Sequence, residues 1–153
     1  MMDEDRCVGA YRGSYVIIPS KWLVIEYHEG IGVVDDAKKS RKKLSADISY
    51  SSNYNVILDV RNLLIDASIK DVWLYIEFLL NNPKIAGVRR TAILTQTPQQ
   101  VAIATLFQEH SRMLPQQVIV VSTIGAALHW VESKMSHHEY ETLIEKMKRE
   151  LDG

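Results

Sequence analysis

Short apolar runs alternate with segments of helical periodicity along most of this chain, and that alternation constrains the fold more than any other feature. The most β-branched runs are NVILDV, RRTAILT and QQVIVVS, which begin at Asn55, Arg89 and Gln116. Each run is followed by a segment whose apolar residues recur every three or four positions. Parallel strands joined by helical crossovers produce this order. The sequence therefore predicts an α/β fold with a mostly parallel sheet and helices packed on both of its faces.

Two shorter β-rich runs come first, Tyr15–Ile18 and Trp22–Tyr27, and Pro19 lies between them. Proline cannot donate a hydrogen bond inside a central strand, so it is found at sheet edges. We therefore expect an N-terminal antiparallel hairpin at the edge of the sheet. Residues 1–13 are expected to form a flexible N-terminus, because they are mostly polar. Residues 14–153 contain no repeat or linker-like tract and are expected to form a single domain.

Side-chain caps mark three helix starts. In each, a Ser or Thr is followed three residues later by an acid or a glutamine, the pattern of a capping box: Ser68 with Asp71, Thr97 with Gln100, and Ser136 with Glu139. These starts predict helices over residues 69–80, from 98 to about 113, and at the C-terminus. A further helix is expected after Val33, with four apolar residues close to one face: Val34, Ala37, Leu44 and Ile48.

Composition restricts the partners. The net charge is −1 over 153 residues, so the chain has no overall positive field for nucleic acid or an anionic membrane. No stretch approaches the roughly 20 apolar residues of a transmembrane helix, and the acidic start lacks the apolar core of a secretory signal. The single cysteine, Cys7, argues against an internal disulfide and a cysteine-based zinc site. We expect a cytoplasmic protein of bacterial type with no transmembrane segment and no nucleic-acid partner.

Catalytic patterns are not visible in the sequence. The adjacent His137 and His138 cannot share one helix face as a metal-binding pair would. Gly30 and Gly32 lack the third glycine of a dinucleotide fingerprint and the lysine of a phosphate loop. No Gly-x-Ser-x-Gly elbow occurs. We therefore expect no enzyme activity, no cofactor and no metal.

Ligands of open α/β sheets bind beyond the carboxyl ends of the strands, near a switch in strand order. Free amides at the helix N-termini there favour anions. The candidate residues for an anion or other ligand at this rim are Arg61, Asp66, Ser68, Lys70, Thr97 and Thr123. An apolar cavity beneath helix 69–80 is a second candidate site, because that helix carries Trp73, Tyr75 and Phe78.

The segment VILDVRNLLIDASIKDVW, from Val56 to Trp73, resembles the signature of STAS domains (sulphate transporters and anti-sigma-factor antagonists). In that signature an apolar strand ends in Asp, and a short turn leads to Asp-Ser-Ser-Gly at the start of a helix. The order of elements from Tyr15 to Val131 is also similar. The chain most resembles the uncharacterised SpoIIAA-like bacterial proteins, stand-alone domains grouped with STAS domains and the CRAL-TRIO lipid carriers.

This resemblance gives Ser68 an implied role. In the antagonists, a partner kinase phosphorylates a serine of the Asp-Ser-Ser-Gly turn, and the phosphate breaks binding. Here the turn is Asp66-Ala67-Ser68-Ile69, in which one serine and the glycine are replaced. Ser68 is therefore the candidate for regulatory phosphorylation. The alternative is that Ser68 only caps its helix, an interaction of about 1 kcal/mol.

Two functions from different classes remain open. The first is a non-catalytic regulatory or protein-interaction module, which binds a protein partner through helix 69–80 and the loop before it. A homodimer would also fit, because the helix after Pro98 is apolar on most sides. The second function, which the wider superfamily implies, is the binding of a small anion or a lipid-like molecule. That ligand would lie at the rim of the sheet or in the cavity beneath helix 69–80.

Overall fold

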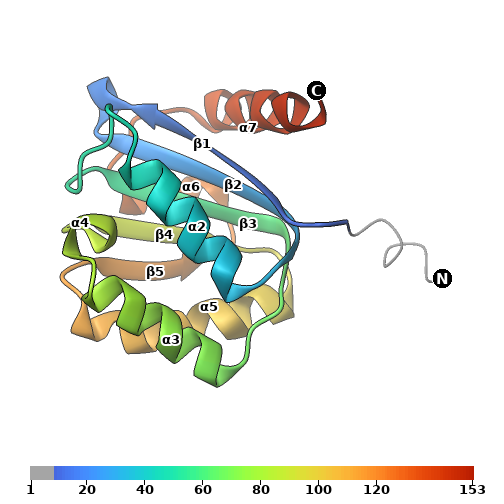
Figure 1. Cartoon of the computed structure of the whole chain (residues 1–153). Coiled ribbons are helices and arrows are strands. Elements are labelled where there is room, and N and C mark those ends of the chain that lie inside the picture. Colours follow the sequence, from blue (N-terminus) through green and yellow to red (C-terminus); the bar gives the residue numbers. More distant parts are fainter. Residues whose placement is uncertain (1–8) are drawn as a thin grey trace.

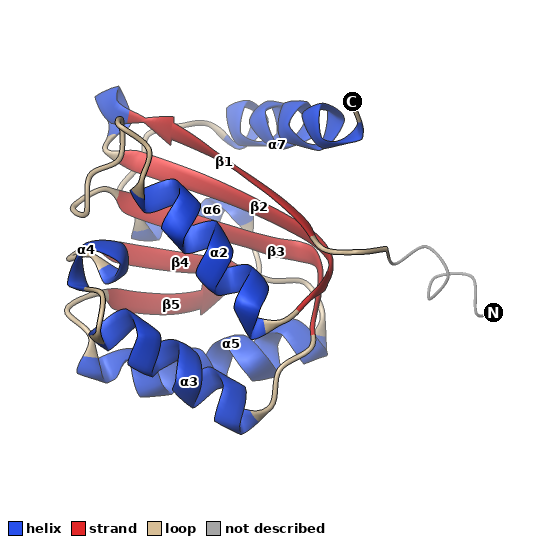
Figure 2. Ribbon diagram, in the orientation of Figure 1, coloured by secondary structure: helices blue, strands red, loops and turns tan. Residues whose placement is uncertain are grey.

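A five-stranded mixed sheet forms the centre of the molecule, with helices on both faces (Figures 1 and 2). The computed structural model describes residues 9–153. The elements in chain order are β1 (Arg12–Ile18), η1 (Pro19–Lys21), β2 (Leu23–Gly32), α2 (Val34–Ser45), β3 (Asn55–Ile65), α3 (Ile69–Leu80), α4 (Pro83–Ala86), β4 (Arg90–Leu94), α5 (Pro98–His110), η2 (Ser111–Met113), β5 (Gln117–Val121), α6 (Ile124–Trp130) and α7 (His137–Asp152).

The strand order follows the sequence, β1-β2-β3-β4-β5. Strands β1 and β2 are antiparallel and are joined by the short 3-10 helix η1 at Pro19, whereas β2 to β5 are all parallel. The expected mostly parallel sheet and its N-terminal hairpin edge are therefore confirmed. The three predicted capping boxes, at Ser68, Thr97 and Ser136, are also present, and α3 has the predicted bounds.

Each connection between parallel strands leads to the next strand in the same direction across the sheet. This direction determines which face of the sheet the connecting helices cover. Because parallel crossovers are right-handed, a sequential strand order places the connecting helices α2, α3 and α5 on one face. Helices α6 and α7, which follow β5, cover the other face (Figure 2). The strand order never reverses, so the sheet has no topological switch of the kind beside which open α/β sheets usually bind their ligands.

Successive side chains of β2 point to opposite faces of the sheet, so alternate residues pack against the two helix layers. Leu23, Ile25 and Tyr27 belong to the core shared with α6 and α7. Val24 packs with Leu44 of α2 on the other side. The next two residues on that side are polar, Glu26 and His28, and both are buried. Two buried polar residues thus occupy positions where a strand covered on both faces usually carries apolar residues.

Three local predictions differ from the structure. Strand β3 continues to Ile65, so Arg61 lies within a strand and not in the turn after it. Ile48 is fully exposed, because α2 ends at Ser45. Strand β1 begins at Arg12, inside the segment expected to be flexible. Residues 1–8 of that segment, Cys7 among them, lie outside the described residues. None of the described helices is long and apolar enough to span a membrane.

Candidate ligand-binding cavity

A cavity of about 170 Å³ lies between the sheet and the helices α2, α3 and α5. Its wall is mainly apolar. Representative lining residues come from the sheet and from two of the helices: Leu58, Val60, Ile93, Val72, Ala104 and Phe107. The predicted cavity beneath helix 69–80 therefore exists, although of the three aromatic residues named for it only Tyr75 lines the wall.

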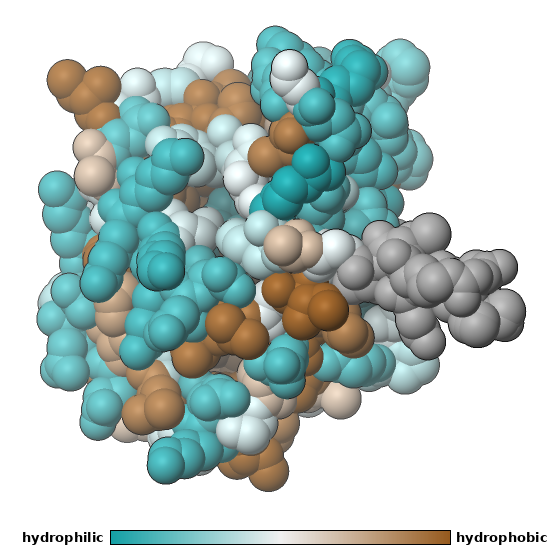
Figure 3. Space-filling view, turned by 45° about the vertical axis from the view of Figure 1, so that its right-hand side comes forward, coloured by the Kyte–Doolittle hydropathy of each residue, from teal (hydrophilic) through white to brown (hydrophobic). Residues whose placement is uncertain are grey.

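The cavity reaches the surface where α2 and α3 begin. Val33, the residue before α2, lines it and is 43% exposed, and Ala67 and Asp71 line it beside the start of α3. Exposed apolar side chains also occur at the ends of β2 and β3 and at the start of α3: Ile31, Leu64 and Ile69. Ile31 and Leu64 are neighbours across β2 and β3. Figure 3 shows apolar residues gathered on the side of the molecule that is turned forward, where these strands end.

A chain of buried polar side chains forms one wall of the cavity. The Tyr11 hydroxyl lies 2.7 Å from Nδ1 of His28, and Nε2 of His28 lies 3.0 Å from Oε1 of Glu26. Burial raises the pKa of Tyr11 to about 12, so this hydroxyl keeps its proton and donates it. A carboxylate can only accept, so Nε2 of His28 donates to Glu26. Both ring nitrogens of His28 thus have a hydrogen-bond partner within the protein.

Glu26 is the centre of this polar wall. Its side chain is 2% exposed, and Oε2 lies 2.9 Å from Nη2 of Arg41. The angle of that contact makes it an ion pair without a directed hydrogen bond. Burial would raise the pKa of Glu26, but the charge of Arg41 and the hydrogen bond from His28 lower it below its ordinary value. Glu26 is therefore ionised within the fold at neutral pH.

A second buried arginine, Arg89, belongs to the same cluster. It is 6% exposed, and its guanidinium lies over the ring of Tyr50, 5.3 Å from the centroid, and donates from Nη2 to the Tyr50 hydroxyl. Its Nε and Nη1 have no hydrogen-bond partner among residues 9–153. Burial and repulsion by Arg41 lower the pKa of Arg89. The cluster therefore holds two guanidinium groups against one carboxylate.

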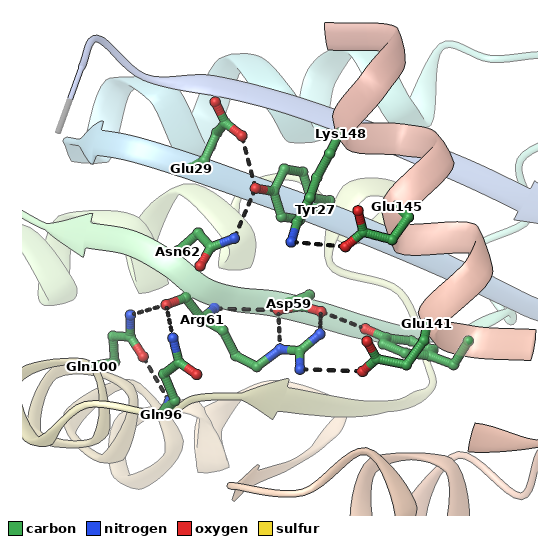
Figure 4. A network of polar contacts seen from close by, with 11 residues as sticks. Tyr27, Glu29, Asp59, Arg61, Asn62, Gln96, Gln100, Glu141, Glu145 and Lys148 are labelled. Carbon is green, nitrogen blue, oxygen red and sulfur yellow. Dashed lines mark hydrogen bonds and ion pairs between the residues drawn. The ribbon is translucent and has the colours of Figure 1, made fainter. Parts of the chain in front are cut away.

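The predicted rim residue Arg61 lies on the opposite face of the sheet, toward α7 (Figure 4). Its guanidinium is held by the buried carboxylate of Asp59, with Nη2 2.8 Å from Oδ2, and lies 3.7 Å from Glu141. The Tyr140 hydroxyl donates to the same Asp59 oxygen at 2.9 Å. The carbonyl of Arg61 accepts from the amides of Gln96 and Gln100, at 3.0 Å each. The charge of Arg61 is thus already paired within the protein.

The other rim candidates are not gathered at one point. Thr97 and Thr123 cap α5 and α6, where each accepts from the amide of the third residue onward. Asp66, Ser68 and Lys70 are exposed around the start of α3. The structure brings Thr97 close to Arg61 through Gln100, which binds both. Thr123 belongs to the α6 side of the sheet, away from the opening of the cavity.

Ser68 caps α3 at the edge of that opening. Its hydroxyl accepts from the Asp71 amide at 3.1 Å, and its own amide donates to the Asp71 carboxylate at 2.9 Å. The neighbouring Ala67 lines the cavity. The cap is therefore present as predicted, and the exposed hydroxyl also remains a candidate for phosphorylation.

Replacing Ser68 by Ala is expected to lower the free energy of unfolding by about 1 kcal/mol, because one amide of α3 loses its acceptor. Ser68→Asp is expected to change it little, since Asp is an equally good cap and its charge suits a helix N-terminus. Urea unfolding followed by circular dichroism measures both. Lys70→Ala, at an exposed position two residues further on, is the control. Equal stability of Ser68→Ala and wild type would contradict this account of the cap.

Sequence reasoning missed the cluster of Glu26, Arg41 and Arg89. These residues lie far apart in the sequence, and arginines and glutamates are usually exposed. One signal was available: within LVIEYHEG, Glu26 and His28 alternate with apolar residues in a strand next to the edge of the sheet. A strand that helices cover on both faces is usually apolar throughout. Two polar residues at alternate positions of such a strand indicate that their side chains are paired with other polar groups in the interior.

Comparison with known proteins identifies the fold. Neither a protein-family model nor a curated protein sequence matches the chain. Among solved structures, the chain is similar to an uncharacterised protein of the DUF3478 family from Shewanella loihica PV-4, described as having a SpoIIAA-like fold. The TM-score is 0.53 at 14% identity, over 81% of this chain and 95% of that one. The chain has a SpoIIAA-like fold. The expected resemblance to SpoIIAA-like proteins is confirmed at the level of the fold.

Proposed function

We propose that this SpoIIAA-like protein is a non-catalytic binding protein, which takes a small and mainly apolar molecule into the cavity beneath α3. The cavity itself carries the proposal. It is about 170 Å³ in volume, its wall is mostly apolar, and it opens to the surface between the starts of α2 and α3. Apolar cavities of about 150 Å³ stay dry and bind molecules the size of benzene.

The volume restricts the size of the ligand. Pockets for drug-sized molecules are about 300–1,000 Å³, so a long acyl chain does not fit without expansion of the cavity. We therefore favour a ring or a short branched chain over the lipid-like ligand. The alternative site at the rim for a small anion receives less support, because Arg61 is paired and the caps occupy helix amides there.

Filling the cavity tests this proposal. Ala104 lines it on α5 and is 4% exposed, so Ala104→Leu should place three additional carbon atoms in the empty space. We expect toluene to raise the melting temperature of the wild type by preferential binding to the folded state. The Ala104→Leu variant should lose that shift while its own stability stays equal or rises.

Ala102→Leu is the matched control, because Ala102 lies on the same helix but is exposed. It should keep the shift with toluene. A wild-type melting temperature that does not respond to toluene at all would contradict the proposal, as would an unchanged response in Ala104→Leu.

A second candidate function is the binding of a protein partner at this end of the sheet. The exposed apolar side chains Ile31 and Leu64, at the ends of β2 and β3, and Ile69, at the start of α3, favour it. Val72 of α3, in contrast, is 6% exposed and lines the cavity. Ser68 lies beside the exposed Ile69, so a phosphate there would add about −1.5 to −2 charges next to an apolar side chain. Loss of binding by Ser68→Asp, but not by Ser68→Ala, would identify this mode.

A further inference from the structure

Arg89 faces the same layer as the cavity. The ladder between β4 and β5 extends to this residue, because the Gln117 amide donates to the Arg89 carbonyl at 2.9 Å. Side chains two residues apart on a strand lie on one face, and Thr91 lines the cavity. The intervening Arg90 lies on the other face, where its guanidinium is 5.0 Å from the centroid of Trp130. Arg89 therefore lies beside the inner end of the cavity, next to Arg41 in its wall.

The buried cluster has an excess of positive charge. Glu26 faces the guanidinium groups of both Arg41 and Arg89, and only Arg41 forms an ion pair with it. Nε and Nη1 of Arg89 are buried and lack an acceptor within the described chain. A buried charge without a partner is strongly unfavourable, and guanidinium donors match the two oxygens of a carboxylate. A bound anion would therefore complete this cluster.

We propose that the ligand is a small carboxylic acid whose apolar body fills the cavity and whose carboxylate binds the buried arginines Arg89 and Arg41. This inference rests on the proposed function and specifies the class of ligand. Arg41 lines the cavity and Arg89 lies directly behind it in the cluster, so the carboxylate lies at the inner end and the apolar body toward the opening. Nε and Nη1 of Arg89 are the free donors of this cluster, and binding of the carboxylate requires that the side chain turn them toward the cavity, because Arg89 does not itself line the wall.

Acidic residues at the opening of the cavity favour this orientation of the ligand. Asp36 and Asp71 line the cavity where α2 and α3 begin, and each accepts from the amide of the residue that caps its own helix. A carboxylate placed at the opening would be repelled by both. At the inner end it meets guanidinium groups. The charges along the cavity thus favour an acid bound with its carboxylate inward.

Benzoate and benzyl alcohol distinguish a charged from a neutral group on the same ring. Isothermal titration of the full chain should show that benzoate binds the wild type at least about tenfold more tightly than benzyl alcohol. Arg89→Met should abolish that preference and leave the binding of benzyl alcohol unchanged. Arg90→Met, which removes the neighbouring guanidinium on the other face, should keep the preference. Removal of an unpaired buried charge is not expected to unfold the protein.

The outcomes separate this inference from the function on which it rests. If wild type binds both compounds equally, or if Arg89→Met keeps the preference, the inference is wrong and the apolar cavity remains a binding site. If neither compound binds, the proposed function itself is wrong. Should Arg89→Met fail to fold, the ratio of the two wild-type affinities still decides, because a ratio near one excludes a role for the buried arginines.

Discussion

Replacing Glu26 by Gln is expected to lower the free energy of unfolding by about 3–5 kcal/mol, one of the two largest effects we predict. Gln has nearly the same shape, so the change removes the charge and leaves the space filled. Arg41 and Arg89 would then lie buried near each other with no carboxylate between them. For a chain of this length, the melting temperature should fall on the order of 10 °C.

The pH dependence of the same variant gives an independent readout. The folded-state pKa of Glu26 is lower than its ordinary value of 4.5, so its ionised form stabilises the fold. That contribution is fully present above the unfolded-state pKa, and it is lost as the pH falls through the lower folded-state pKa. The difference in stability between wild type and Glu26→Gln should therefore be constant near neutral pH and shrink below about pH 4.

Glu109→Gln is the control for this experiment. Glu109 forms an ion pair with Arg112 at 3.3 Å, but both side chains are largely exposed, so its loss should change stability by less than about 1 kcal/mol. A Glu26→Gln variant as stable as this control would show that the buried arginines do not depend on the carboxylate. Such a result would also weaken the inference that they lack an anion.

The second large effect is expected at Asp59, on the opposite face of the sheet. Asp59→Ala should lower the free energy of unfolding by about 3–4 kcal/mol, because Arg61 and the Tyr140 hydroxyl lose one shared acceptor. Burial, followed by the charge of Asp59, raises the pKa of Tyr140, so its hydroxyl stays protonated and needs an acceptor. Equilibrium unfolding in urea measures the change.

Two variants that each remove one contact of this network provide reference values for the stability change of Asp59→Ala. Tyr140→Phe removes one hydrogen bond and should cost about 1 kcal/mol. Glu141→Gln removes a partly exposed partner 3.7 Å from Arg61 and should cost less. If Asp59→Ala costs no more than Tyr140→Phe, then Arg61 does not need its buried partner, and its guanidinium is free to bind a ligand at the rim as the sequence suggested.

Local chemistry explains why the fold was predictable. The capping boxes at Ser68, Thr97 and Ser136 each involve two residues three apart, and that information is contained in the sequence. The alternation of strand and helix then predicts a parallel sheet with few possible topologies. The error at Ile48 has a local cause as well, because the apolar spacing continued past the point where α2 ends.

The cavity was predicted only as a place beneath helix 69–80, and its chemistry was not. Glu26, Arg41 and Arg89 come from β2, α2 and the residue before β4, so only the packed layers bring them together. The rim failed as an anion site for a related reason. Strand β3 extends to Ile65, which places Arg61 in register with Asp59 on the same face of the strand.

The attachment of α7 to the hairpin has a consequence for synthesis on the ribosome. Tyr140, Ile144 and Met147 cover a core that includes Leu23 and Ile25, and Arg12 donates to the Leu151 carbonyl at 3.1 Å. Strands β1 and β2 are therefore synthesised well before α7, the helix that shields their outer face. During translation that face stays exposed, and available to chaperones, until α7 has left the exit tunnel.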